Sequence, residues 1–320
     1  AHSLIDAEIA ERHNIPFKPV INEFAKMTGG NENIKDKKTT VAREAVVEWL
    51  REQNLLEKEE PIKQNIATAE RSGGTIEPLP KLQWFIAVNK PFTMKHSEIV
   101  GIAEGQEVTL AGLMRHVVET NQIKITPEHF SKTYFHWANN LRDWCISRQI
   151  WYGHRIPVWY KGPANSPTEI HCDINAPMGD DWQQDEDTLD TWFSSGLWTF
   201  STLGWPNQTE DFKNFHPNSV LETGYDILPF WVARMILMAT YHTGQIPFKD
   251  VFLHGMVRDG QNRKMSKSLG NIIDPLTMTD KYGTDALRFA LVFNTAAGTD
   301  MALAEDKIKG MKHFGNKLWN

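Results

Sequence analysis

The chain has 320 residues, with 34 basic and 40 acidic side chains and a formal net charge of −6. This length suffices for one large or two ordinary domains, and the acidic balance disfavours a module whose main surface holds nucleic-acid phosphates. The two cysteines, Cys145 and Cys172, form no C-x-x-C pair, which argues against a zinc knuckle or a disulfide framework and fits a reducing compartment. The first residues form neither a signal peptide nor an initiator methionine, so we expect the chain to begin inside a longer protein.

The first eighty residues predict two helices separated by polar loops. Ser3 caps the first helix, and Asp6 lies in its first turn, where the helix dipole favours a carboxylate. Residues 22–38 form a polar loop, and Thr40 caps a second helix with one apolar side. Residues 65–80 are rich in glycine and proline, which indicates a connector and a domain boundary near residue 80.

Residues 81–217 show little chemistry when they are taken alone. A helix that begins at Thr126 carries an aromatic stripe at helical spacing, which is more typical of a core than of a base-stacking surface. Residues 161–187 are rich in Pro, Asn and Asp and predict a surface insertion, and its one cysteine, Cys172, predicts no zinc. The serine pair at 194–195 lacks the G-x-S-x-G arrangement of a hydrolase nucleophile.

A strand, a helix and a second strand follow, and the first strand ends in polar residues. Residues 219–223 predict a strand that ends at Gly224, and Asp226 precedes an apolar helix that runs from Ile227 to about residue 241. Ile227 and Trp231 are four residues apart and therefore share a helix face, so an apolar pocket beside a carboxylate is one interpretation. Core packing for the two apolar side chains and an N-cap for Asp226 are the alternative.

The second strand, Val251–Leu253, is expected to be buried and leads into a long loop that carries cations and hydroxyl groups. Lys264 and Lys267 lie in this loop with two serines, and Asp274 caps the next helix. Compact ammonium groups with hydroxyl donors suit the oxygens of a triphosphate, although a solvated basic turn is the alternative. Because a strand–helix–strand unit has parallel strands whose carboxyl ends share one edge, we expect both strand ends and the loop to face one cleft.

Several strings resemble class I aminoacyl-tRNA synthetases. Residues 264–268 read KMSKS, which is similar to the second signature of that class. Residues 143–149 read DWCISRQ, as in the valyl and isoleucyl branches, whereas GHRIP at 153–157 and LDTWFSS at 189–195 resemble the valyl branch. Residues 1–8 are similar to the end of the editing domain in the valyl, leucyl and isoleucyl enzymes.

This resemblance implies an α/β fold, namely the second half of a Rossmann-like, parallel-sheet catalytic domain. It implies that residues 1–80 are the C-terminal remnant of the inserted editing domain, residues 81–293 are the catalytic half with a connecting insertion, and residues 294–320 begin the helical stem-contact and anticodon-binding domain. The implied activity is ATP-dependent ligation of valine to its tRNA through a valyl-adenylate, with editing of mischarged threonine.

The resemblance also implies roles for individual residues. The implied catalytic residues of the loop are Lys264, Ser266, Lys267 and Ser268. The residues implied to contact ATP are Gly224, Asp226, His254, Gly255, Met256, Val257 and Lys267. The implied walls of the amino-acid pocket are Trp192, Ile227 and Trp231, and Asp6 is the implied editing residue that holds the substrate ammonium.

The implied substrates and partners are ATP with Mg²⁺, valine and the valine tRNA. We expect no zinc or other metal site built by the protein, no membrane, a monomer and a cytoplasmic location. The signature that cradles ATP in the first half of the fold is absent, so we expect the chain to be inactive alone. An isoleucyl-tRNA synthetase fragment, a non-catalytic nucleotide- or RNA-binding piece, and an editing hydrolase are the alternatives.

Overall fold

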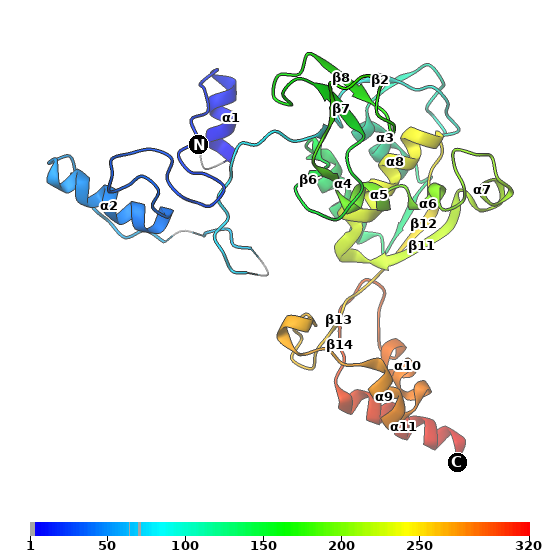
Figure 1. The fold of residues 1–320 in the computed structure, drawn as a ribbon. Coiled ribbons are helices and arrows are strands. Elements are labelled where there is room, and N and C mark those ends of the chain that lie inside the picture. Colours follow the sequence, from blue (N-terminus) through cyan, green and yellow to red (C-terminus); the bar gives the residue numbers. More distant parts are fainter. Residues whose placement is uncertain (1–3, 64, 70–71) are drawn as a thin grey trace. The chain divides into compact units, whose positions relative to one another are not determined.

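The computed structural model describes residues 4–63, 65–69 and 72–320, and at Ser268 the backbone alone. The chain divides into two compact units, Ala1–Leu82 and Gln83–Asn320, hereafter unit 1 and unit 2 (Figure 1). The division lies just after the stretch rich in glycine and proline, where the sequence places a connector. Residues 83–320, including the last helices, belong to one unit.

The described residues of unit 1 include two helices, α1 (Leu4–Arg12) and α2 (Thr39–Glu52). The predicted cap of the second helix is wrong, because Thr40 lies inside α2 and Lys38 precedes the helix without a side-chain cap bond. The predicted cap of the first helix, Ser3, lies outside the described residues. The other described residues of unit 1 form loops, with isolated bridges such as Ile21 to Met27.

Unit 2 mixes many short strands with helices. In chain order, the elements up to residue 215 are β1 (Phe85–Ile86), β2 (Phe92–Thr93), β3 (Glu107–Val108), α3 (Leu110–Glu119), β4 (Lys124–Thr126), α4 (His129–Asn139), β5 (Trp144–Cys145), β6 (Ser147–Arg148), β7 (Val158–Lys161), β8 (Glu169–Cys172), β9 (Trp182–Gln184), β10 (Thr188–Leu189), α5 (Thr191–Ser195), α6 (Trp198–Ser201) and α7 (Glu210–Phe215). Then follow β11 (Asn218–Gly224), α8 (Ala233–Thr243), β12 (Phe248–His254), β13 (Val257–Arg258), α9 (Pro275–Tyr282), α10 (Thr284–Val292), β14 (Met301–Ala302) and α11 (Glu305–Trp319).

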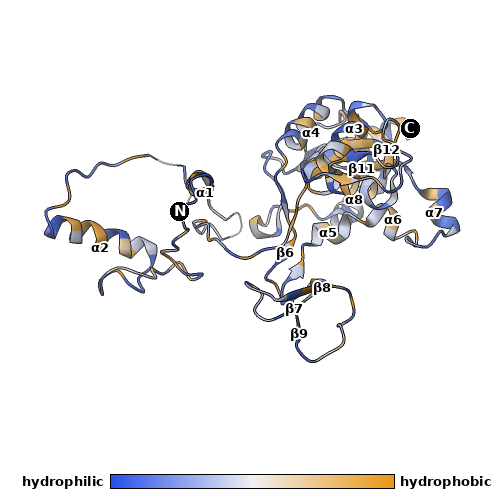
Figure 2. Cartoon of the chain, turned by 90° about the horizontal axis from the view of Figure 1, so that it is seen from above, coloured by the Kyte–Doolittle hydropathy of each residue, from blue (hydrophilic) through white to orange (hydrophobic). Residues whose placement is uncertain are grey.

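The central sheet has the order β11-β12-β4, and all its pairs are parallel, as the strand–helix–strand pattern predicted. One face is packed, because Leu221, Val251 and Leu253 are buried in a core to which α3, α4 and α8 contribute. Figure 2 shows hydrophobic colours gathered where α3 and the parallel strands meet. The other face is open: Val220 is 57% exposed and Phe252 39% exposed. The expectation that 251–253 is buried throughout is therefore wrong at Phe252.

The helix expected to begin at Ile227 begins differently. A 3-10 turn, Tyr225–Ile227, is followed by a π-helical segment, Leu228–Val232, before α8 becomes regular at Ala233. Pro229 lies in the first turn of this segment, where its missing N–H is tolerated, and the wider turn is closed by the bond from Ala233 N to the Leu228 carbonyl. Gly244 ends α8 in the left-handed conformation, as expected for a glycine beyond a helix end.

Two further expectations are resolved by the structure. Residues 161–187, predicted as a surface insertion, contribute β8 and β9, which flank β7 in an antiparallel sheet. Asp274 does cap α9, because its carboxylate accepts from the backbone N–H groups of Leu276 and Thr277. No helix among the described residues is long and apolar enough to cross a bilayer.

Candidate functional site

The carboxyl ends of β11 and β12 lie side by side, since Gly224 pairs with His254. A Cβ atom on Gly224 would lie 2.7 Å from Asp226 Oδ1, 3.4 Å from Met256 Sδ and 3.6 Å from His254 Cε1. The structure therefore brings together four of the residues predicted to contact ATP. Glycine keeps this space open, because any larger side chain would displace the neighbours.

His254 is held at the mouth of a cavity. Its Nδ1 donates to the carbonyl oxygen of Gly255 at 2.8 Å, and its Nε2 lies 3.4 Å from Glu222 Oε1. A cavity of about 480 Å³ opens here, and its lining includes Glu222, His254, Gly255 and Val257 on the strand side and residues between 291 and 301 opposite. A second hollow, about 820 Å³, lies along β4 and is lined by none of the predicted site residues.

The loop from Arg258 to Asn271, hereafter the KMSKS loop, is closed at its base by two polar side chains. Asn271 donates to Asp259 Oδ2 at 2.9 Å and to the Lys264 carbonyl at 3.1 Å, and it accepts from Ser266 N at 2.9 Å. Asp259 also accepts from the backbone and guanidinium of Arg263. These donors, Asn271 first, hold the pKa of Asp259 well below its usual range, although burial opposes them.

The cations of the loop fall into two groups. Arg258 and Arg263 pair with Asp300 and Asp259, whereas Lys264 and Lys267 are exposed and neither ammonium has an acidic partner among the described side chains. Ser266 caps the 3-10 turn Lys267–Leu269 by accepting from Leu269 N at 3.3 Å. The side chain of Ser268 lies outside the described atoms. Among the described side chains, the loop thus presents two lysine charges without an acidic partner, on a backbone that Asn271 and Asp259 hold in place.

The strand ends and the lysines are not joined directly. No hydrogen bond or ion pair links Lys267 with Asp226 in the described part of the chain, and neither side chain lines the cavity beside His254. The common cleft for both groups stays a prediction.

The predicted amino-acid pocket centres on α5 and the π-helical segment, which contact each other. Trp231 Nε1 donates to the Ser195 carbonyl at 3.1 Å, and the Trp192 ring lies 6.2 Å from that of Phe230. Trp192 therefore lies in α5, and Trp231 contacts the same helix. Ile227 is half-buried at the end of the preceding 3-10 turn.

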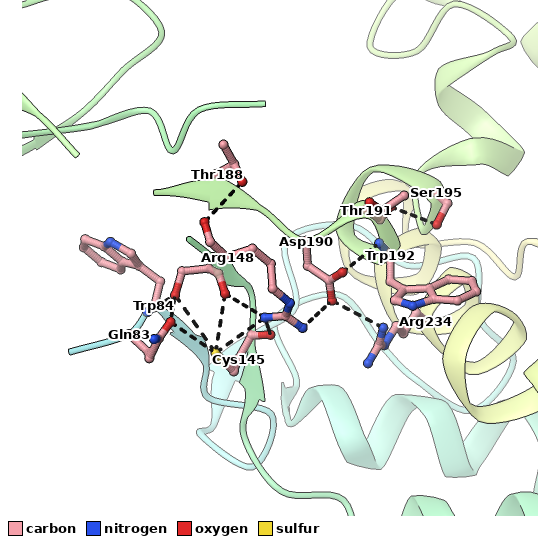
Figure 3. Close-up of polar contacts among 11 residues, drawn as sticks. Gln83, Trp84, Cys145, Arg148, Thr188, Asp190, Thr191, Trp192, Ser195 and Arg234 are labelled. Atoms are coloured by element: carbon pink, nitrogen blue, oxygen red, sulfur yellow. Dashed lines mark hydrogen bonds and ion pairs between the residues drawn. The ribbon is translucent and has the colours of Figure 1, made fainter. Parts of the chain in front are cut away.

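Sequence reasoning missed a charged network that supports Trp192 (Figure 3). Asp190 accepts from Trp192 N at 3.2 Å, binds Arg148 at 2.9 Å, and lies 3.6 Å from Arg234 NH1. The Arg234 guanidinium lies over the Trp144 ring at 4.4 Å. Burial, with a smaller contribution from Arg148, lowers the pKa of Arg234, while Asp190 opposes the shift. Asp190 lies within the LDTWFSS string, and this string was the sequence feature that could have pointed to the network.

The predicted editing residue belongs to the other unit. Asp6 lies in the first turn of α1 and is exposed. The remaining predicted site residues all belong to unit 2. Among the described residues no group of three or more His, Cys, Asp and Glu side chains is arranged to hold a metal ion.

Comparison with known proteins assigns the family. The chain matches the model of the class I tRNA synthetases for isoleucine, leucine, methionine and valine over residues 31–177 and 167–304, and so belongs to this family. The resemblance drawn from KMSKS and the strings upstream is confirmed at this level, and with it the α/β catalytic fold.

Individual relatives are similar along the whole chain. It is 43% identical to a valine–tRNA ligase of Bdellovibrio bacteriovorus and 45% identical to one of Streptomyces avermitilis, each time over 100% of this chain and 34% of the relative. The chain thus spans about a third of the length of these curated relatives. A methionyl-tRNA synthetase of Mycobacterium tuberculosis bound by methionyl-adenylate matches 68% of this chain and 41% of that chain, with 20% identity and a TM-score of 0.47.

Proposed function

We propose that this chain is the second half of the catalytic domain of a valine–tRNA ligase, preceded by the end of its editing domain (residues 1–80) and followed by the start of its helical domain (294–320). The convergence of Gly224, Asp226, His254 and Met256 at two parallel strand ends carries the proposal. Ligands of open α/β sheets bind at this edge. The exposed Val220 and Phe252 support the half-domain assignment, because parallel sheets are usually covered on both faces.

The proposed reaction has two steps. The valine carboxylate attacks the α-phosphate of ATP, which forms valyl-adenylate and releases pyrophosphate. A hydroxyl of the 3′-terminal adenosine of the tRNA then takes the aminoacyl group, and AMP leaves. The protein contributes positioning and charge stabilisation rather than covalent chemistry. Lys264 and Lys267 have no acidic partner among the described side chains, so their charge is available for the leaving pyrophosphate. Mg²⁺ accompanies the triphosphate.

The nucleotide and the amino acid are assigned to adjoining elements. Asp226 accepts from the ribose hydroxyls, and the 254–257 segment frames the adenine. Valine is admitted between Trp192, Ile227 and Trp231. A hydrophobic pocket rejects threonine, which replaces a methyl by a hydroxyl, only about a hundredfold. This shortfall gives a reason for the editing step, in which Asp6 holds the ammonium of the mischarged residue.

The proposal is tested by titrating the chain with a non-hydrolysable, sulfamoyl-linked valyl-adenylate analogue in a calorimeter. Saturable binding that weakens at least tenfold in Asp226→Ala is expected, because a ribose contact is lost. Asp285→Ala is the matched control, since Asp285 is 97% exposed on α10 and its ion pair among the described residues is with its helix neighbour Arg288. No binding, or equal binding by Asp226→Ala, contradicts the proposal.

Further assays separate the alternatives. Tighter binding of the isoleucyl analogue would favour an isoleucine enzyme. Rapid deacylation of threonyl-tRNA would favour an editing hydrolase. The chain alone is expected to show no valine-dependent ATP–pyrophosphate exchange, and robust exchange would refute the half-domain assignment.

A further inference from the structure

Asp300 contacts two segments that lie far from it in the sequence, Tyr225 and residues 256–258. It lies between α10 and β14, and its side chain is 21% exposed. Oδ1 accepts from Met256 N at 2.8 Å, just beyond β12. Oδ2 accepts from Tyr225 OH at 3.0 Å, just beyond β11, and from Arg258 Nε at 2.5 Å, on β13. One carboxylate therefore binds both strand ends of the site and the first residue of the KMSKS loop.

The backbone around Asp300 packs closely against the residues that follow β12. A Cβ atom on Gly255 would lie 1.9 Å from the Thr299 carbonyl oxygen and 2.6 Å from Asp300 N, so only glycine allows this approach. Met301 N donates to the Met256 carbonyl at 3.0 Å, and β14 pairs with β13 in parallel. The contact between Asp300 and the strand ends is therefore supported by main chain on both sides.

The contacts continue from Arg258 into the loop. Arg258 forms an antiparallel bridge with Lys264, the first lysine of KMSKS. The Lys264 carbonyl in turn accepts a hydrogen bond from Asn271, the residue that closes the loop base. An unbroken series of contacts thus leads from Tyr225, the neighbour of Asp226, through Asp300 and Arg258 to Lys264.

The charge states suit this arrangement. Burial acts to raise the pKa of Asp300, but the donors from Met256, Arg258 and Tyr225 outweigh it and leave this pKa below the usual value. The bond to Asp300 raises the pKa of Tyr225, so the phenol keeps its proton. At neutral pH a carboxylate accordingly faces a guanidinium and a neutral phenol.

We propose that Asp300 is a positioning residue that couples the nucleotide end of β11 and β12 to the KMSKS loop. Asp300 fixes Met256 and Tyr225 beside the predicted ATP contacts, and through Arg258 it fixes the start of the loop that carries Lys264 and Lys267. The nucleotide part of this inference rests on the proposed function. Coupling of this kind is reciprocal, so nucleotide bound at the strand ends and order in the loop favour each other.

The test is amide hydrogen exchange of the 320-residue chain without ligand, read by mass spectrometry. Asp300→Ala is expected to speed exchange in peptides covering 256–266 by about tenfold or more, because the hydrogen bonds that a charged carboxylate accepts from Met256, Tyr225 and Arg258 are lost. Gly255→Ala is expected to give the same pattern, since it displaces residues 299–300 without touching the carboxylate. Tyr225→Phe removes one donor and is expected to give a smaller increase in the same peptides.

The controls separate a local effect from general destabilisation. Asp285→Ala, the same substitution at an exposed carboxylate of the same unit, is expected to leave the loop unchanged. Peptides from α8 are expected to exchange at the wild-type rate in all these variants. Wild-type exchange in the loop of Asp300→Ala overturns the inference, and so does an increase spread equally over α8.

A second arm adds ATP with Mg²⁺. In the wild-type chain, exchange is expected to slow both at the strand ends and in the loop, whereas in Asp300→Ala the slowing at the loop is expected to be lost. If ATP slows exchange nowhere in the wild type while Asp300→Ala still loosens the loop without ligand, the proposed function fails and the positioning role stands. If ATP slows exchange in both places equally in the two proteins, the coupling is refuted.

Discussion

Unit 1 and unit 2 differ in how much apolar surface they bury. Among the described residues of unit 1 the buried apolar side chains are only Ala10, Ile21, Ile34 and Ala42. Unit 2 has a continuous core built from α3, α4, α8 and the parallel strands. Because burial of apolar surface is the main stabilising contribution to folding, unit 2 can hold a site rigidly, whereas unit 1 has little to offset the entropy of its loops. The predicted nucleotide residues lie in unit 2, on the edge of that core.

The largest effect on stability is expected from a substitution that leaves a cavity in the core of unit 2. Phe248 on β12 is fully buried, and Phe248→Ala is expected to lower the free energy of unfolding by about 3–5 kcal/mol, because the lost apolar contacts leave a cavity. Urea unfolding followed by tryptophan fluorescence measures this change, since all tryptophans except Trp49 lie in unit 2.

The matched variant in unit 1 is Ile34→Ala, at a side chain that is 7% exposed. It is expected to leave the main fluorescence transition in place, and Trp49→Phe identifies the part of the signal that comes from unit 1. A shift of the main transition by Ile34→Ala as large as that of Phe248→Ala would show that the two units unfold as one and would break the comparison.

The next effect is expected at the charged network behind Trp192. Asp190 is 7% exposed and Arg234 13% exposed, so Asp190→Ala leaves a buried guanidinium without its carboxylate. A loss of about 3 kcal/mol in stability is expected, since removing one partner of a buried pair is costly. The matched change in unit 1, Glu48→Ala, breaks an ion pair whose side chains are 52% and 61% exposed, and about 0–1 kcal/mol is expected there.

Equilibrium unfolding of the two variants measures the contrast. The double variant Asp190→Ala/Arg234→Met is expected to recover part of the loss, because the unpaired charge is removed as well. Equal losses for Asp190→Ala and Glu48→Ala would refute the view that burial makes the network of unit 2 important.

The sequence predicted those parts of the site whose signals are local. Apolar runs and short sequence strings predicted the ends of β11 and β12, the loop with Lys264 and Lys267, and the Asp274 cap. Asp300 could not be found in this way, because its partner Tyr225 is 75 residues away and nothing near Asp300 marks the contact. The π-helical segment was missed because apolar periodicity does not distinguish it from an α-helix, although Pro229 was a hint.

A smaller, local effect is expected at the base of the KMSKS loop. Asn271→Ala removes both donors and the acceptor that hold Asp259, the Lys264 carbonyl and Ser266 N. Cleavage by trypsin at Lys264 and Lys267 is expected to become about tenfold faster, which corresponds to about 1.4 kcal/mol of local opening.

Mass spectrometry of the early fragments measures cleavage at each lysine. Lys63 in unit 1 serves as the internal reference, because it is exposed and lies in no helix, strand or bridge. Cleavage at Lys264 in the wild type as fast as at Lys63, or an unchanged rate in Asn271→Ala, would show that the contacts of Asn271 do not restrain the loop.

The smallest effect is expected from pH, and it again falls on unit 2. Burial lowers the pKa of His216 and of His242, and the backbone contact of His216 with Thr199 only partly offsets this. The folded state therefore binds protons less readily than the unfolded chain, whose histidines titrate near pH 6.5. The stability that the neutral rings contribute is fully present above about pH 6.5 and is lost as the pH falls through their lower folded-state pKa values.

His242 packs against Trp205 and Phe200 at ring distances of 5.4 and 6.0 Å. His242→Phe therefore keeps an aromatic ring in place and is expected to flatten the pH dependence of the free energy of unfolding below pH 6.5. An unaltered slope in that variant would assign the loss at low pH to other groups.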